Sequence, residues 1–74
     1  MTITIYSKYF SSKDIICELK NIKQTGNNYT ATFNLNDKTC HVRFEKVIRY
    51  TRSGESYITY NCKGKYELTA VIND

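Results

Sequence analysis

The sequence predicts an α+β fold that is predominantly antiparallel β, with one short helix covering the apolar face of a sheet. Three observations favour this class. Apolar and polar residues alternate along several stretches, as they do in strands with one buried face. Glycines or an Asn-Asp pair separate these stretches at spacings that suit β-hairpins. A further segment carries apolar residues at helical spacing. The chain has 74 residues, which is enough for a single domain, 1–74, with a small core.

The N-terminal region supplies one strand and the helix. Ile3 and Ile5 alternate with polar residues, which predicts a strand over residues 2–6. The helix is predicted over residues 12–24, where four apolar side chains would share one face. These side chains are Ile15, Ile16, Leu19 and Ile22.

The ends of that helix have candidate signals, but a strand is the alternative. Ser11 or Ser12 would cap its start, and Gly26 would end it. However, the segment also alternates with period two, and its isoleucines favour strands. In that case the fold would be an all-β six-stranded small barrel.

Four strands form the predicted antiparallel meander that the helix would cover. They span residues 28–35, 38–51, 55–61 and 65–72. The first alternates most cleanly, with apolar side chains at every second position from Tyr29 to Leu35. The second is long for a strand, so we expect strong twist or a bulge near Lys46.

The turns fix a register for these strands. A tight turn at Asn36-Asp37 would pair Phe33 with Cys40, since both turn residues tolerate positive φ. A three-residue loop that ends at Gly54 would pair Ile48 with Ile58. The same kind of loop ending at Gly64 would pair Tyr60 with Tyr66, Ile58 with Leu68, Tyr57 with Thr69 and Thr59 with Glu67.

The reactive side chains do not form a recognisable catalytic or metal-binding motif. The three cysteines have no CxxC spacing, which favours reduced intracellular thiols, with Cys40 and Cys62 buried. His41 would point away from Cys40, because neighbours on a strand face opposite sides. We therefore expect a protein that is not an enzyme and has no cofactor and no metal.

Charge and hydropathy narrow the range of partners. Eleven Lys and Arg against seven Asp and Glu give a formal net charge of +4, which favours acidic partners. The sequence has no apolar run long enough to cross a membrane and no signal-peptide pattern. We expect a cytoplasmic protein without a membrane partner.

The predicted register gathers a basic and aromatic surface on the outward face of the meander. Arg49 would lie beside Tyr57, with Arg52 in the loop above them. Arginine offers a planar fork to phosphate or carboxylate, and tyrosine offers a flat ring for stacking. Alternatively, Arg49 and Tyr57 only stack on each other as a solvated cross-strand pair. The predicted binding residues are Arg43, Arg49, Arg52, Tyr57, Lys63 and Lys65.

Two functional interpretations follow, both of them non-catalytic. Ile, Lys, Asn and Tyr make up 30 of the 74 residues, a bias that AT-rich codons produce. The first interpretation is an antagonist of the phage or mobile-element type that docks this surface onto a host protein or nucleoprotein complex with an acidic surface. The alternative is a direct nucleic-acid-binding domain, for which a net charge of +4 is low.

Overall fold

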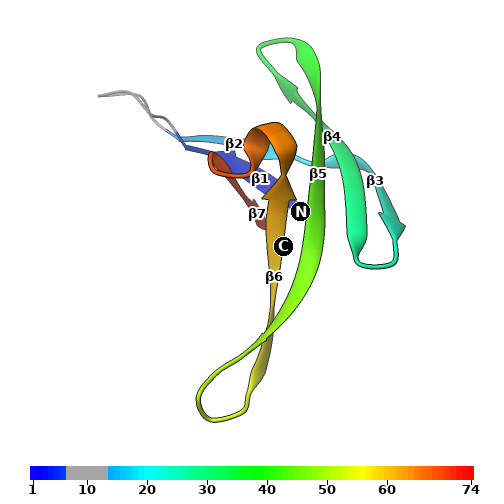
Figure 1. Ribbon diagram of the computed structural model, residues 1–74. Helices are drawn as coiled ribbons and strands as arrows, with labels where there is room; N and C mark the ends of the chain where they lie inside the picture. The colour runs from blue at the N-terminus through cyan, green and yellow to red at the C-terminus, as the bar shows by residue number, and fades with distance from the viewer. Residues whose placement is uncertain (7–13) are drawn as a thin grey trace.

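The computed structural model describes residues 1–6 and 14–74, which form seven strands in two antiparallel sheets (Figure 1). The smaller sheet has the order β2-β1-β7 and the larger sheet the order β3-β4-β5-β6. The predominantly antiparallel β class is therefore confirmed. The elements are β1 (Thr2–Ile5), β2 (Ile15–Glu18), β3 (Lys20–Thr25), β4 (Asn28–Leu35), β5 (Lys38–Tyr50), β6 (Ser56–Lys63), the 3₁₀ helix η1 (Gly64–Tyr66) and β7 (Ala70–Asn73).

The predicted helix over residues 12–24 is wrong for the part of it that the structure describes. Residues 14–24 contain β2 and most of β3 in its place, while the proposed caps Ser11 and Ser12 lie outside the described residues. The physical reason is that β1 has two edges, and β2 supplies the hydrogen-bonding partner for one of them. Gly26 ends no helix. It opens the two-residue turn between β3 and β4 with a φ of 61°.

A short bend between β2 and β3 carries the chain from one sheet to the other. Leu19 is the residue between these strands, and its side chain is buried between the sheets. A bulge follows at once, because the register with β4 shifts between Lys20 and Lys23. Asn21 takes up this bulge with a φ of 53°, a conformation that asparagine tolerates better than most residues. Strands that change sheet commonly turn the corner in this way.

The two central hairpins have the predicted register. Phe33 pairs with Cys40, and the turn residues Asn36 and Asp37 have φ values of 50° and 62°. Ile48 pairs with Ile58 around a three-residue loop, and Gly54 at its last position has a φ of 86°. Of the two features expected near Lys46, strong twist or a bulge, the bulge is absent, because β5 keeps one register with β4 over residues 38–45 and one with β6 over residues 43–50.

The predicted strand over residues 65–72 is only partly right. The chain turns through η1 after β6, and the strand that follows pairs with β1 at the other sheet. The four pairings predicted between β6 and this segment are therefore wrong. The turn also breaks the alternation: Tyr66 is buried, whereas Leu68 is 92% exposed. Burial of the Tyr66 ring against Phe33 explains why the chain leaves the β6 direction.

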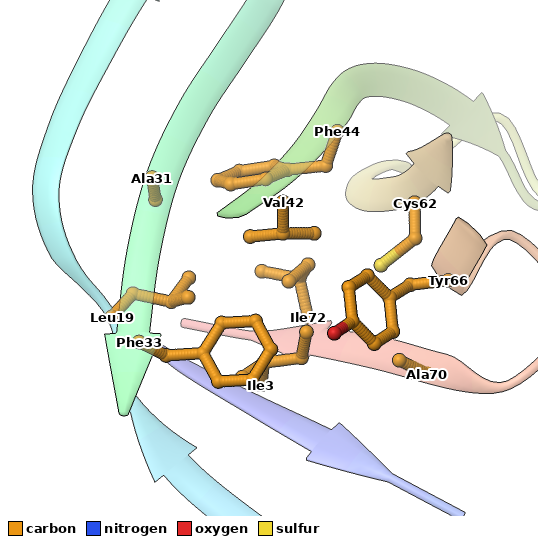
Figure 2. Close-up of a cluster of buried hydrophobic side chains, with 10 residues drawn as sticks. All are labelled: Ile3, Leu19, Ala31, Phe33, Val42, Phe44, Cys62, Tyr66, Ala70 and Ile72. Carbon is orange, nitrogen blue, oxygen red and sulfur yellow. The ribbon is translucent and has the colours of Figure 1, made fainter. Parts of the chain in front are cut away.

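The core lies between the inner faces of the two sheets (Figure 2). Ile3 and Ile72 come from the smaller sheet, and Phe33 and Phe44 come from the larger one. Tyr66 closes one side, with its ring centroid 5.5 Å from that of Phe33. The ten buried side chains are Ile3, Leu19, Ala31, Phe33, Val42, Phe44, Cys62, Tyr66, Ala70 and Ile72.

The β5–β6 hairpin extends well beyond this core (Figure 1). The last pair of β4 with β5 is Asn28 with Glu45, so residues 47–59 form a two-stranded ribbon, here called the arm. The arm explains the elongated shape, with extents of 42 × 31 × 19 Å. The radius of gyration is 13.5 Å, against about 11 Å for a compact chain of this length. Among the described residues no ladder joins β6 to β7, so the sheets do not close into the alternative six-stranded barrel.

Candidate functional site

A row of basic side chains crosses the outer face of the larger sheet. Lys23 on β3 pairs with Thr30 on β4, Thr30 pairs with Arg43 on β5, and Arg43 pairs with Lys63 on β6. Residues in register point to the same side of a sheet, and all four side chains are exposed. With neighbouring strands ~4.8 Å apart, the row is about 14 Å long. We call these four residues the basic row.

The outer face of the larger sheet concentrates the positive charge of the molecule. Among the residues paired in its ladders, five cations against one carboxylate give a net charge of +4, equal to the formal net charge of the whole chain. The other six cations and six acids of the sequence cancel. Unequal distribution of charge produces a local field that the net charge alone does not reveal. The charged residues of this face are Lys20, Lys23, Arg43, Arg49, Lys63 and Glu45.

One carboxylate interrupts this basic surface. Oε2 of Glu45 lies 3.1 Å from Nζ of Lys63, and both side chains are partly exposed. An ion pair of this kind contributes little to stability, roughly 0–1 kcal/mol. It does engage one of the three cations of the basic row, so Lys23 and Arg43 are the two cations of the row that form no ion pair among the described residues.

An open depression of about 420 Å³ lies beside the basic row, over β3, β4 and β5. Lys23, His41 and Arg43 line it together with threonine hydroxyls. The bulge shapes one wall, because Nδ2 of Asn21 donates a hydrogen bond to Oγ1 of Thr32 over 3.1 Å. Thr32 Oγ1 in turn donates to the carbonyl of Lys20 over 3.3 Å. The depression therefore offers cations and hydroxyl groups but no carboxylate, a combination suited to an anion.

A second cluster lies on the same face of the arm. Arg49 and Tyr57 are cross-strand partners, as the sequence predicts. Nε of Arg49 donates to Oγ1 of Thr59 over 3.3 Å, which holds the guanidinium near the sheet. Tyr57 is 47% exposed and keeps a ring face available. Arg49 lies six positions beyond Arg43 along β5, roughly 20 Å away, so the two clusters could contact successive parts of an extended ligand.

The structure brings four of the six predicted binding residues to one face: Arg43, Arg49, Tyr57 and Lys63. Arg52 is exposed in the loop at the tip of the arm. Lys65 does not belong to this face. It lies in η1, and its Nζ is 5.6 Å from the centroid of the Tyr66 ring.

Sequence reasoning missed Lys20, Lys23 and His41. The predicted helix over residues 12–24 contained Lys20 and Lys23, so neither residue had a position on the predicted sheet. The competing strand interpretation, continued from a turn at Gly26, would have placed Lys23 beside Thr30, whereas Lys20 lies beside Thr32 only because of the bulge. His41 was predicted as an exposed strand residue, which it is, but its place in the depression depends on the β3 bulge.

The thiols are free and differ in burial. Cys62 is buried, as predicted, whereas the predicted burial of Cys40 is wrong: Cys40 is half-buried, as is Cys17. Burial raises the pKa of the Cys62 thiol, which keeps it protonated and a poor nucleophile. Burial also raises the pKa of Tyr66, and the neighbouring Cys40 and Cys17 raise it further. Within residues 1–6 and 14–74 there is no group of three or more His, Cys, Asp or Glu side chains that could hold a metal ion.

Comparison of the chain with protein-family models, with curated proteins and with solved structures finds no match. The part of the chain that the structure describes has no helix of sufficient length and hydropathy to span a membrane. The function must therefore be argued from the surface itself.

Proposed function

We propose that this protein is a non-catalytic binding protein whose outer sheet face binds single-stranded nucleic acid. The observation that carries the proposal is the concentration of charge: the basic row, Lys20 and Arg49 lie on one face, with one carboxylate among the residues paired in its ladders. Proteins that bind single strands combine a positively charged surface that follows the phosphates with aromatic rings on which bases stack.

The two clusters on this face have different roles in the proposal. Lys23, Arg43 and the hydroxyl groups of the depression contact phosphate. Tyr57, with Arg49 beside it, stacks an unpaired base at the arm. A duplex keeps its bases stacked inside, so the tyrosine favours a single strand. The low net charge of the whole chain does not argue against this proposal, because the ligand contacts the outer face, where positive charge is concentrated.

The antagonist role against a host protein or nucleoprotein complex stays a prediction. Protein hot spots are typically buried aromatic anchors surrounded by packed residues. The outer face has one exposed aromatic ring, Tyr57, among charged and hydroxyl groups. This composition favours nucleic acid over a protein partner. Placement in the cytoplasm is part of the same proposal.

The salt dependence of binding to a fluorescent single-stranded oligonucleotide tests the proposal. Each phosphate contact adds about 0.7 to the slope of log K against log salt. Contacts from Lys23, Arg43 and Arg49, with Lys63 held by Glu45, would give a slope of roughly −2. Arg43→Ala is expected to weaken binding and to reduce the slope by about 0.7.

Two further variants complete this experiment. Lys38→Ala removes an exposed cation from the same strand, at a position that pairs with Leu35 and has the inner-face parity. It should bind almost as the wild type does. Tyr57→Ser should lose about 1–3 kcal/mol of binding, and Tyr57→Phe should retain it. Equal binding by Arg43→Ala and Lys38→Ala, or a slope near zero, would contradict the proposal and would favour a protein partner.

A further inference from the structure

The depression beside the basic row is a groove along β4, and both of its walls supply hydrogen-bond donors. Thr30 and Thr32, with their short side chains, form its floor. Their cross-strand partners Arg43 and His41 form the wall on β5, and Lys23 belongs to the wall on β3. An anion in this groove is therefore within reach of N–H donors from two sides and of the Thr30 hydroxyl from below.

The groove is closed on the side away from the arm. The Asn21 side chain reaches across from the β3 bulge and donates its hydrogen bond to Thr32, so it stands over the floor at that end. The next outer-face pair of the ladder is Asn34 with Thr39, whose side chains hydrogen-bond each other over 3.4 Å. Neither of them is charged, and the turn beyond them holds the carboxylate of Asp37. A nucleic-acid strand that follows the positive charge of the outer face therefore has its end in this groove.

The charge around the groove exceeds that of a phosphate inside a strand. Lys23 lines the groove, Lys20 is the cross-strand partner of Thr32 at its closed end, and Arg43 lies on the side of the arm. A phosphodiester carries about one negative charge, whereas a phosphate monoester carries about −1.5 to −2 at pH 7 and has three strong acceptor oxygens. These cations, with the imidazole of His41 as a further donor, match the monoester better than the diester.

Arg43 connects the groove with the rest of the basic surface. Its Nη2 lies 3.5 Å from the position that a Cβ on Gly64 would take, so the guanidinium is on the β6 side of the groove. Its side chain is exposed and can turn toward the groove without leaving a buried partner. Arg43 is therefore placed between the anion in the groove and the phosphate that follows it toward the arm, whereas Lys23 and His41 reach the groove alone.

We propose that this groove binds the terminal phosphate monoester of a single-stranded nucleic acid, and that the strand runs from there along β5 to the arm. This rests on the proposed function and specifies its ligand. Lys23, His41 and the Thr30 hydroxyl hold the monoester. Arg49 and Tyr57 then take a phosphate and a base roughly 20 Å beyond Arg43. The monoester can belong to the 5′ or the 3′ end of the strand, which fixes the direction of the ligand on the sheet.

Titrations of the full chain against matched oligonucleotides test the terminal phosphate. The probe is an oligothymidine of about eight nucleotides with an internal fluorophore, carrying a 5′-phosphate, a 3′-phosphate or hydroxyl groups at both ends. One phosphorylated form should bind about tenfold more tightly than the hydroxyl form, because the added charge forms charge-assisted hydrogen bonds. A hydroxyl form two nucleotides longer adds the same charge within the backbone and should gain much less. If neither terminal phosphate exceeds this control while all forms bind, the groove proposal is overturned and the proposed function stands. If no form binds, both are overturned.

The ratio of affinities for the phosphorylated and hydroxyl forms locates the monoester on the protein. Lys23→Met and His41→Ala should each lower this ratio toward unity, because each removes a donor from the groove. Arg49→Ala is the matched control, since it removes a cation from the same face at the arm. It should weaken both forms by the same factor and keep the ratio. All three side chains are exposed, and thermal melts check that the variants fold. If Arg49→Ala lowers the ratio as much as Lys23→Met does, the monoester has no fixed place in the groove and the proposal is overturned.

Discussion

The two ends of the β5–β6 hairpin have the same residue pattern but opposite environments. At the packed end Phe44 and Cys62 are cross-strand partners and are 1% and 4% exposed. Four residues further along each strand, Ile48 and Ile58 are also partners and more than half of each is exposed. Both pairs lie on the inner face of the same ladder. Alternation along a strand thus determines which side a residue faces, and it leaves open whether anything covers that side.

The cover comes from parts of the chain that are remote in sequence. The smaller sheet places Ile3 and Ile72 over the packed end, and η1 adds Tyr66 there (Figure 2). These segments belong to the two ends of the chain, and β7 with Asp74 reaches only the base of the arm, where it lines an open depression with Ile58 and Thr59. The arm beyond them keeps the apolar alternation of a core strand without a second layer (Figure 1).

The largest expected difference between the two ends is the effect of truncating their inner side chains. Phe44→Ala should destabilise the protein by about 3–5 kcal/mol, because it leaves a cavity and removes the stacked contact with Tyr29, whose ring centroid is 5.0 Å away. Ile48→Ala should cost less than about 1 kcal/mol, because little buried contact is lost. Urea unfolding of the two variants measures both losses. Similar losses would mean that the arm is covered in the monomer.

Alkaline pH should destabilise the packed end selectively. The pKa of Cys62 is raised above its ordinary 9.0, and that of Tyr66 above its ordinary 10.0, both chiefly by burial. Below pH 9 both groups are neutral in the folded and unfolded chain, so their full contribution to stability is present. As the pH rises from 9, the unfolded chain ionises first, and stability falls until the raised pKa values of the folded state are passed.

Unfolding free energies between pH 7 and pH 11 check this behaviour. Cys62→Ala removes one titrating group and should flatten the alkaline decline. If the decline is as steep in Cys62→Ala as in the wild type, the Cys62 thiol does not contribute to it. Stability that rises between pH 9 and pH 11 would contradict both assignments.

Substitutions at two glycines with positive φ can distinguish global unfolding of the protein from local opening of the arm. Gly64, with a φ of 68°, begins η1 at the packed end, and Gly54, with a φ of 86°, lies at the tip of the arm. A β-branched residue is strained in this region by about 1–2 kcal/mol. Gly64→Val should lower the free energy of unfolding by that amount. Gly54→Val should leave it nearly unchanged and accelerate amide hydrogen exchange at Arg49 and Tyr57, a cross-strand pair of the ladder, because the arm opens locally. An equal loss of global stability would show that the arm unfolds together with the core.

The local turns explain how much of the fold could be predicted. Asn36-Asp37 and Gly54 fix the register from β4 through β6, because each turn needs positive φ at these positions. The segment 14–25 could not be decided, since short apolar stretches fit both periodicities and its partner β1 precedes it by many residues. The strand after β6 was extrapolated from alternation, and nothing local indicated that Tyr66 would turn inward.

The sequence could place a residue of the candidate site only where it correctly predicted the strand that carries that residue. The pairing of Arg49 with Tyr57 followed from the loop at Gly54. Lys23 could not be placed beside Thr30, because β3 was taken for a helix. Lys65 was assigned to the site on the assumption that the strand continues beyond Gly64, and η1 removes it. The exposure of the arm depends on where the smaller sheet ends, which no pattern within the hairpin encodes.

The smallest effect on stability is expected at Glu45, on the boundary between the packed end and the arm. This residue pairs with Asn28 on one side and Asn61 on the other, and its carboxylate binds Lys63. Glu45→Gln should change the free energy of unfolding by less than about 1 kcal/mol, because the ion pair is at the surface. Binding of single-stranded nucleic acid should nevertheless become tighter, since the variant removes the carboxylate that pairs with the basic row and frees Lys63 for phosphate. The slope of log K against log salt should steepen by up to about 0.7. Glu67→Gln is the matched control, because it removes the same charge from an exposed position beyond η1. Tighter binding in both variants would mean that total charge governs affinity, whereas tighter binding in Glu45→Gln alone would locate the phosphate contacts on the basic row.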